Sequence, residues 1–324
     1  MSAGAQVIVV TDAAGCTETV TITLADPAAV AATTTVVSNV SCNGLSDGSA
    51  SASATGGVGA YTYDWDNGET GATATNLAVG THTVTATDAN GCTATQTVAI
   101  TEPVALSVAT AVDQDVSCNG GIDGGATATA SDGTSGYTYV WSNGETGASA
   151  TALSVGQHSV TATDANGCTA VTTVTITEPA ALTLSGVVTD VTCNGALNGA
   201  INITVGGGTT AYIYAWSGTG VVAADEDQTG LSGGTYSVLI TDGEGCTISA
   251  TYTIDEATDV VLTGTGVDPT CNGGGDGSVT VSASGGVSPY SYTNGGAAQS
   301  SPTFSGLSAG AQVIIVTDAA GCTE

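Results

Sequence analysis

Short stretches in which apolar or small residues alternate with Thr or Ser recur along the whole chain. Residues 81–87 (THTVTAT) and 93–100 (TATQTVAI) alternate β-branched and small side chains, and residues 88–91 (DANG) between them have the composition of a hairpin turn. Residues 49–55 (SASASAT) alternate in the same way, and residues 61–65 begin a further strand that ends at an Asn-Gly turn. No stretch has the apolar period of a helix together with its caps, so the pattern predicts a chain of strands with almost no helix.

The pattern repeats with a period of 75 to 78 residues. Each repeat contains CNG-x-x-(D/N)-G and, later, TD-x-x-GC, and the first three repeats have Y-x-Y-x-W between them. The fourth repeat reads Tyr290-Ser-Tyr292 and lacks the tryptophan. Glu102-Pro103 and Glu178-Pro179 mark two of the joints. We therefore predict modules at 27–102, 103–178, 179–256 and 257–324, with 1–26 as the C-terminal part of a preceding module and the last module lacking its final strand.

A longer period is also present. Residues 2–18 and 308–324 match at every position except Val9 against Ile315, which corresponds to an offset of 306 residues. Four modules thus form a larger repeat that begins again near residue 308. We expect the chain to be an interior piece of a longer array.

Six or seven short strands in about 76 residues, with a buried Trp on a central strand, are typical of an Ig-like β-sandwich. The predicted fold class is all-β: a tandem array of Ig-like (PKD-like) β-sandwich modules that forms an elongated filament. The core aromatic residues of these modules are predicted to be Trp65, Trp141 and Trp216.

The charge of the chain excludes several functions. It has 29 acidic residues and no Lys or Arg, a formal net charge of −29. Without cations the chain cannot neutralise phosphates, so we expect no nucleic-acid partner and no attraction to an anionic membrane, and we expect no direct membrane insertion. Because charged residues make up only 9% of the chain and hydrophobic residues 41%, it is not an acidic disordered segment. The composition favours a secreted, extracellular structural protein that is not an enzyme.

Cysteines recur at spacings that alternate between roughly 26 and roughly 50 residues. No close pair suits zinc, so we predict structural disulfides of an oxidising compartment. Pairing within each module would give Cys42–Cys92 and its equivalents. Pairing between the CNG cysteine of one module and the GC cysteine of the next would give Cys42–Cys168 and its equivalents, and a third scheme bridges each joint. The sequence leaves the three open for the nine cysteines: Cys16, Cys42, Cys92, Cys118, Cys168, Cys193, Cys246, Cys271 and Cys322.

Repeated carboxylates are the main candidates for a binding site. Asp at the first position of a turn ordinarily accepts hydrogen bonds from nearby backbone amides, and this is our expectation. The alternative is Ca²⁺ held at the joints with Glu102 and Glu178, although the spacing of a calcium-binding loop is missing. The Ca²⁺ candidates are Asp47, Asp88, Asp123, Asp164 and Asp276.

We expect the aromatic and histidine side chains to serve in packing and hydrogen bonding. Alternation places Tyr61, Tyr63 and Trp65 on one face of a strand, where we expect a buried core; the alternative is a platform on which sugar rings stack. His82 and His158 occupy the position that Tyr236 fills in the third module, so we expect packing or hydrogen bonding there and no catalysis.

The combination of CNG-x-x-DGS, Y-x-Y-x-W-x-NG, TDANGC and the Glu-Pro joint resembles the SprB repeat, and the Y-x-W and V-T-x-T-D pattern also resembles the PKD domain. The resemblance implies a large adhesin on the cell surface of gliding bacteria, exported by the type IX secretion system. We therefore expect a structural filament that holds an adhesive region away from the cell. Expected partners are neighbouring copies of the filament and surface polysaccharide; the alternative functions are carbohydrate-binding or Ca²⁺-dependent adhesive modules.

Overall fold

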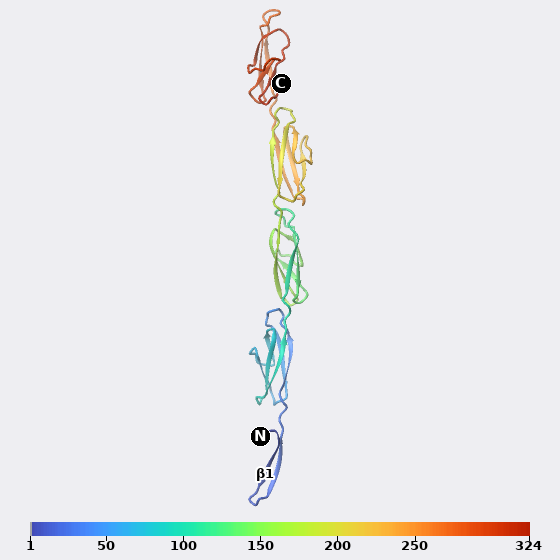
Figure 1. The fold of residues 1–324 in the computed structure, drawn as a ribbon, viewed down its shortest axis with the longest axis vertical. Coiled ribbons are helices and arrows are strands. Elements are labelled where there is room, and N and C mark those ends of the chain that lie inside the picture. The colour runs from blue at the N-terminus through green and yellow to red at the C-terminus, as the bar shows by residue number, and fades with distance from the viewer. Residues whose placement is uncertain (1) are drawn as a thin grey trace. The chain divides into compact units, whose positions relative to one another are not determined.

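The computed structural model describes residues 2–324, and every regular element in this range is a β-strand. The contacts divide the chain into two compact units, Met1–Asp113 with Gly125–Ile176 and Gln114–Gly124 with Thr177–Glu324. Within them the strands form small β-sandwiches in tandem (Figure 1). This confirms the predicted all-β fold and its tandem Ig-like organisation.

Module one is the set of six strands that follows the N-terminal hairpin. One sheet has the order β3-β4-β6 and the facing sheet the order β5-β7-β8, with all neighbours antiparallel. The strands are β3 (Ala31–Ser38), β4 (Gly48–Thr55), β5 (Thr62–Trp65), β6 (Thr73–Leu77), β7 (Gly80–Thr87) and β8 (Thr93–Ile100).

Modules two and three repeat this topology, with sheet orders β12-β10-β9 and β11-β13-β14, then β15-β16-β18 and β17-β19-β20. The strands of module two are β9 (Ser107–Gln114), β10 (Gly124–Ser131), β11 (Thr138–Trp141), β12 (Ser149–Leu153), β13 (Gly156–Thr163) and β14 (Thr169–Ile176). Those of module three are β15 (Thr183–Thr189), β16 (Gly199–Gly206), β17 (Ile213–Ser217), β18 (Gln228–Leu231), β19 (Gly234–Thr241) and β20 (Thr247–Ile254). The module boundaries at 27, 103, 179 and 257 remain predictions.

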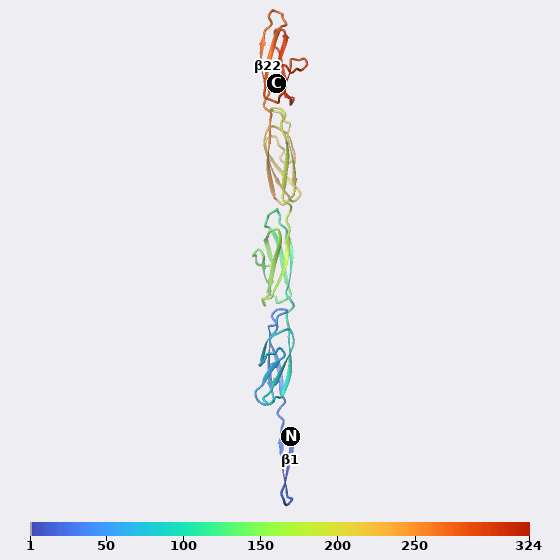
Figure 2. The same ribbon diagram turned by 90° about the vertical axis from the view of Figure 1, so that its left-hand side faces the viewer.

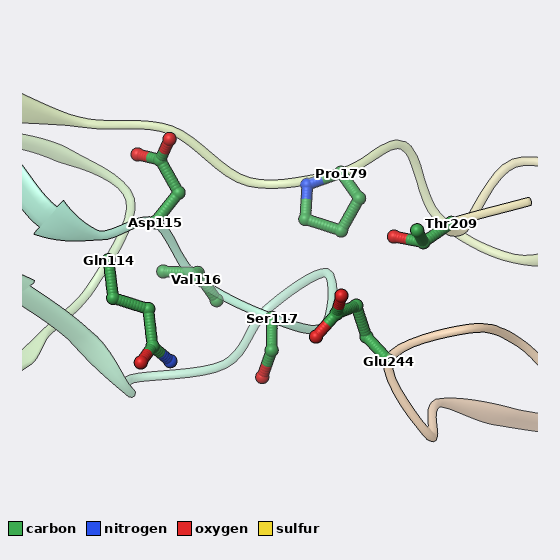
Figure 3. A pocket seen from close by; sticks show the side chains of 7 residues that line it. All are labelled: Gln114, Asp115, Val116, Ser117, Pro179, Thr209 and Glu244. Carbon is green, nitrogen blue, oxygen red and sulfur yellow. The ribbon is translucent and has the colours of Figure 1, made fainter.

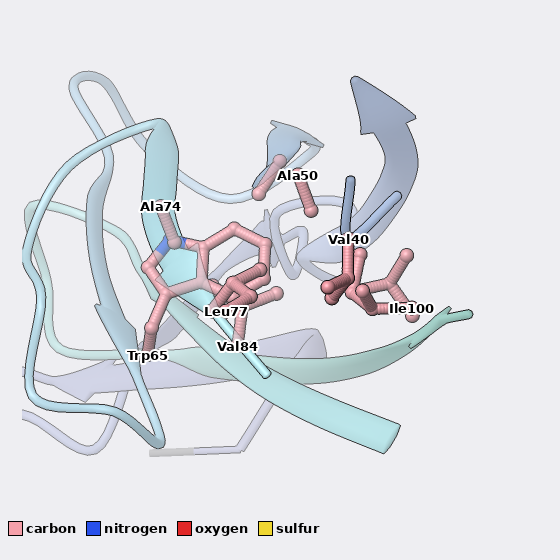
Figure 4. Packing of buried hydrophobic residues seen from close by; sticks show 9 residues of the cluster. Val40, Ala50, Trp65, Ala74, Leu77, Val84 and Ile100 are labelled. Atoms are coloured by element: carbon pink, nitrogen blue, oxygen red, sulfur yellow. The ribbon is translucent and has the colours of Figure 1, made fainter. Parts of the chain in front are cut away.

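Alternation of side chains directs one residue in two to the space between the sheets, where small residues leave room for one indole (Figure 4). In module one Trp65 packs with Leu77 and Val84, while Ala50 and Ala74 are fully buried beside it. The indole Nε1 donates a 3.0 Å hydrogen bond to the Gly71 carbonyl, so the one polar atom of the ring is satisfied.

The tryptophan strand differs from expectation in one respect. Trp65 is buried, as predicted, but β5 lies at the edge of its sheet and β7 occupies the centre. The reason is the hairpin β7–β8: its full-length pairing, Gly80 with Ile100 through Thr87 with Thr93, leaves only the other edge of β7 for the short β5.

Module four replaces the missing tryptophan from another strand. Its strands are β21 (Val261–Val267), β22 (Gly277–Ser284), β23 (Ser291–Thr293), β24 (Thr303–Leu307) and β25 (Ile315–Thr317). Register alignment places Asn294 at the position of Trp65 and Phe304, which is 6% exposed, at that of Ala74. In module one the large residue, Trp65, lies on one sheet and faces the small Ala74 on the other. In module four the Asn294 side chain is exposed, and the large residue, Phe304, comes from the opposite sheet.

Among residues 2–324, the second sheet of module four holds β23 and β25. β25 has three residues and begins at Ile315, whereas β7 has eight. At the other end, β1 (Gly4–Thr11) and β2 (Thr17–Leu24) form a two-stranded sheet with no third strand beside it (Figures 1 and 2).

We predict that Phe304→Ala destabilises module four by about 3–5 kcal/mol, the usual cost of truncating a buried Phe. Hydrogen exchange of peptides from β22 and β24 should accelerate, while peptides from β4 and β6 of module one serve as the internal control. Unchanged exchange in β22 would show that Phe304 does not replace the indole.

Candidate functional site

Three disulfides connect successive modules: Cys42–Cys168, Cys118–Cys246 and Cys193–Cys322. Each joins the CNG loop, between the first two strands of a module (residues 39–47, 115–123, 190–198 and 268–276), to the GC turn, between the last two strands of the next module (residues 88–92, 164–168, 242–246 and 318–322). Of the three schemes left open by the sequence, the structure contains the staggered one, and pairing within a module is wrong. The Cα atoms of each pair lie 5.5 to 5.7 Å apart.

Cys16, Cys92 and Cys271 are free and exposed, contrary to the expectation that all nine cysteines are bridged. The physical reason is the register of the pairing. Bonded cysteines are separated by 126, 128 or 129 residues, and these three have no cysteine at that separation in the required direction within the chain.

A carboxylate or amide inside each CNG loop fixes the residue that precedes the cysteine. Asp47 accepts a 2.9 Å hydrogen bond from the Ser41 amide and a short one from its hydroxyl, and these bonds, the hydroxyl first, lower the pKa of Asp47. Asn198 contacts Thr192 at the same two groups: its Oδ1 accepts from the Thr192 amide at 3.2 Å, and its Nδ2 donates to the Thr192 hydroxyl at 2.6 Å. A Ser or Thr directly before each CNG cysteine was the signal for this contact, and sequence reasoning missed it.

The glutamate of each joint also accepts a hydrogen bond from the CNG loop. The Glu102 carboxylate lies 2.7 Å from the Gly44 amide nitrogen, and the Asn43 side chain donates to the Pro103 carbonyl at 3.2 Å. The second joint repeats both contacts, with Glu178 on Gly120 at 2.6 Å. At these two joints, side-chain hydrogen bonds therefore link the CNG loop to the joint residues in addition to the disulfide.

The aspartate of the GC turn connects two loops of the same module. Asp88 is buried, and one carboxylate oxygen accepts from the Asn90 and Cys92 amides at 2.9 and 2.8 Å. The other accepts from the Val58 amide at 2.9 Å, in the loop between β4 and β5. These amide bonds, that of Val58 first, lower the pKa of Asp88.

Equivalent bonds occur at Asp164, Asp242 and Asp318, each with its pKa lowered by the corresponding loop amide first. The approach requires glycine in the loop: Gly57 has φ +62°, and a Cβ there would lie 2.4 Å from the Asp88 carboxylate. Sequence reasoning identified the turn bonds but not the loop bond.

The Ca²⁺ candidates are thus engaged by amide and hydroxyl donors. Asp123 and Asp276 bond Ser117 and Thr270 as Asp47 bonds Ser41, and Asn198 replaces the carboxylate without loss of contact. Among residues 2–324 the structure brings together no group of three or more His, Cys, Asp or Glu placed to hold a metal ion. The arrangement matches the expectation of carboxylates that accept from the backbone.

The histidines occupy the predicted slot. His82 Nε2 and His158 Nε2 lie 3.0 and 2.8 Å from the carbonyls of Ala78 and Ser154, and the Tyr236 hydroxyl donates to the Ser232 carbonyl at 2.8 Å. Partial burial disfavours the charged ring of His82, but the bonds to Ala78 and Asp66 outweigh it and raise its pKa.

The aromatic strand is used for packing and for loop contacts. Trp65 is buried, Tyr63 packs against the same cluster, and the Tyr61 hydroxyl donates to the Gly56 carbonyl. Tyr137 and Tyr212 make the same bond, each at 2.6 Å to the residue five positions earlier. The core interpretation accounts for these contacts without a sugar.

A hollow of about 470 Å³ lies beside the second joint, within the second unit (Figure 3). Its walls come from the CNG loop (Asp115, Ser117), from the joint (Pro179) and from the loops of module three (Thr209, Glu244). Figure 3 shows the Glu244 side chain extending from its loop toward Ser117 and Pro179. Polar and apolar side chains both line it, and no set of catalytic groups converges there.

Comparison with known families identifies four SprB repeats, at residues 34–70, 110–146, 185–221 and 263–297. No curated protein matches the sequence significantly. Among residues 2–324, no helix has the length and apolarity needed to cross a membrane.

Solved structures with similar architecture include a crystal structure of a tetra-tandem repeat from the extending region of a large adhesion protein (17% identity, 91% of this chain and 97% of that chain, TM-score 0.28). The eight N-terminal Ig domains of Down Syndrome Cell Adhesion Molecule are similar over 90% of this chain and 56% of that chain (11% identity, TM-score 0.31). Domains 1–6 of the surface layer protein SbsC are similar over 88% and 52% (17% identity, TM-score 0.25).

We predict that the turn carboxylate makes stability depend on pH in a defined direction. Because the folded pKa of Asp88 lies below 3.8, its contribution is complete above that value and is lost as the pH falls through the folded pKa. Asp88→Asn should lower the melting temperature of module one at pH 7, and the difference from wild type should narrow below pH 3.8.

Calorimetry of both proteins across this range provides the measurement. Asp12→Asn is the matched control, because Asp12 bonds only the amides of its own turn. A difference between Asp88→Asn and wild type that is constant with pH would contradict the role of the charge.

We also predict that Glu102→Ala accelerates exchange of the Gly44 amide about fivefold, equivalent to about 1 kcal/mol for one lost hydrogen bond. Glu102→Gln keeps an acceptor oxygen and should restore most of the protection. Equal exchange in the two variants, measured by NMR, would show that the joint does not depend on this bond.

Proposed function

We propose that this chain, which contains four SprB repeats, is part of the shaft of a bacterial cell-surface adhesin that holds a distal adhesive region away from the cell. The SprB repeats indicate an extracellular adhesin repeat region. The finer assignment, to surface attachment and gliding by a protein exported through type IX secretion, is part of the same proposal.

The observation that carries the proposal is the staggered disulfide register. A bridge within a module would stabilise only that module, whereas Cys42–Cys168 and its two equivalents span the joint and restrict bending there. The glutamate and asparagine bonds at each joint act on the same hinge. Resistance to bending is what a shaft requires and what a set of independent binding domains does not.

The charge supports the same role. Twenty-nine carboxylates with no Lys or Arg give every module a negative surface. We estimate a length of roughly 40 Å per module from the rise of a strand. The average spacing of the 29 carboxylates along the chain is then shorter than the Debye length at physiological salt, which is about 8 Å. Parallel shafts should therefore repel one another, which limits pairing between their sheet edges.

Disulfides of this kind form in oxidising surroundings, which supports an extracellular location. We propose surface polysaccharide and neighbouring filaments as the partners of the complete adhesin. The shaft itself supplies reach, and the three joints supply stiffness.

The proposal predicts particles about 160 Å long for four modules, at the estimated 40 Å each. Negative-stain images of the oxidised protein should show straight rods. Cys42→Ser should introduce a bend at the first joint, and Cys92→Ser, which removes a free cysteine, is the matched control.

Compact globules, or equal straightness of Cys42→Ser and wild type, would contradict a shaft stiffened by disulfides. A chelator provides the second comparison: a large fall in melting temperature on addition of EDTA would favour the Ca²⁺-dependent adhesive module instead. Binding to a glycan array that is lost in a folded Trp65→Ala variant would favour the carbohydrate-binding module.

A further inference from the structure

The CNG loop of module one contains an Asn-Gly step whose two reactive groups are both held by residues of the joint. The Gly44 amide nitrogen donates to the Glu102 carboxylate at 2.7 Å. The Asn43 side-chain amide donates to the Pro103 carbonyl at 3.2 Å. Glu102 and Pro103 are half-buried at this contact, so the loop and the joint cover each other.

The next two joints repeat the arrangement. In each, a joint glutamate accepts from the glycine amide of the CNG loop, and the following residue accepts from the asparagine side chain. The pairs are Gly120 with Glu178 at 2.6 Å, Asn119 with Pro179 at 3.1 Å, Gly195 with Glu256, and Asn194 with Ala257 at 3.4 Å. The contacts persist although the third joint has Glu-Ala in place of Glu-Pro, so they depend on the asparagine and the glutamate.

An Asn-Gly step is prone to deamidation, because glycine has no side chain to hinder the approach of its own amide nitrogen to the asparagine side chain. The turn requires this step. Gly44 has φ +80°, in a turn closed by the bond from the Leu45 amide to the Cys42 carbonyl, so a side chain there would be strained. Asn43 is required for its bond to the joint. The labile pair is therefore built into the loop.

The Asn-Gly steps elsewhere in modules one and two are held locally. The Gly68 amide donates to the Trp65 carbonyl at 3.0 Å, and the Gly167 amide donates to the Asp164 carbonyl at 3.0 Å. Each of these bonds lies inside one turn and does not depend on the joint. The acceptor of the Gly44 amide, by contrast, lies 58 residues further along the chain.

We propose that the CNG asparagines Asn43, Asn119 and Asn194 are modification sites that deamidate when their joint opens and are protected while it is closed. In the open joint the Gly44 amide nitrogen loses its proton to hydroxide and attacks the side-chain carbonyl carbon of Asn43. A succinimide forms, and the side-chain nitrogen takes up a proton from water and leaves as ammonia. Water then opens the ring at one of its two carbonyls, which gives aspartate or isoaspartate. No electrons are transferred, and water is the co-reactant.

The product disfavours closure of the joint. A carboxylate at position 43 presents an acceptor to the Pro103 carbonyl, which is itself an acceptor, so the bond of the asparagine side chain cannot form again. It also adds a negative charge next to the residue that Glu102 contacts, in a chain with no Lys or Arg to neutralise it. Each event therefore marks and loosens one joint irreversibly. This inference goes beyond the proposed shaft and requires only that a joint opens.

The test measures deamidation of the full, oxidised chain at each site during incubation at mildly alkaline pH. After reduction and alkylation, an Asp-specific protease yields peptides 26–46 and 115–122, which separate the CNG sites of the first two joints. Mass spectrometry with fragmentation then gives the sum of aspartate and isoaspartate at each asparagine.

Glu102→Ala should accelerate deamidation of Asn43 about fivefold, the factor expected when the glycine amide loses one hydrogen bond. Asn119 in the same molecule keeps its glutamate and should deamidate at the wild-type rate. Glu178→Ala should give the reverse result, with Asn119 accelerated and Asn43 unchanged. Glu102→Gln keeps an acceptor oxygen and should remain near the wild-type rate.

Cys168→Ser opens the same joint and leaves every residue of the CNG loop in place. It breaks the Cys42–Cys168 bond, so that module two is no longer bridged to the loop. Asn43 should again deamidate faster than Asn119, whose disulfide is intact.

Equal rates at Asn43 and Asn119 in Glu102→Ala and in Cys168→Ser would overturn the proposal. So would equal acceleration at Asn67, whose glycine is bonded within its own turn, because that result would indicate loss of the fold and not opening of the joint. These rates do not depend on the length or straightness of the particles, so the proposed shaft function is tested separately.

Discussion

The disulfide between the CNG loop of one module and the GC turn of the next is the constraint on which the other features depend. Each module is small. The core of module one, for example, contains one indole among Val, Ala, Leu and Ile side chains, so the module has little apolar surface to stabilise it alone. A bridge that closes 126 to 129 residues of chain removes much of the freedom of the unfolded state. Because both sulfurs lie in loops, the loops must be held in place, and the carboxylates described above serve that purpose. The Asp47–Ser41 and Asp164–Thr134 bonds position the two loops that the Cys42–Cys168 bridge joins.

The structure thus replaces ion pairs by bonds from carboxylates to amides. A protein without Lys or Arg cannot neutralise a buried carboxylate with a cation, yet Asp88, Asp164, Asp242 and Asp318 are all buried. Three amide donors satisfy each of these carboxylates. Two donors come from the turn itself and require the spacing TD-x-x-GC, and the third comes from the facing loop, where the close approach requires a glycine. In the CNG loop of module three, the neutral Asn198 takes the place of the aspartate. One acceptor for the Thr192 amide and one hydrogen bond to the Thr192 hydroxyl are therefore sufficient there.

Much of this architecture could be predicted from the sequence, because the repeats display the same pattern several times. Alternation located β4, β7 and β8 to within one residue, and the exchange of His82 for Tyr236 identified a hydrogen-bonding slot. The sequence left the disulfide register open, since pairing depends on which ends of a sandwich meet. Tertiary contacts without a local signal were also missed: the edge position of β5 depends on the full-length β7–β8 pairing, and Phe304 replaces Trp65 from the opposite sheet.

The bond between His82 and Asp66 is the single salt bridge among residues 2–324, and it requires a protonated ring. Added salt therefore has almost no attraction between side chains to weaken, whereas it screens repulsion among 29 carboxylates. In most folded proteins, rising ionic strength weakens attractive ion pairs on the surface. In this protein it mainly weakens the repulsion between carboxylates. The folding of the array should therefore become more favourable, not less, as the ionic strength rises.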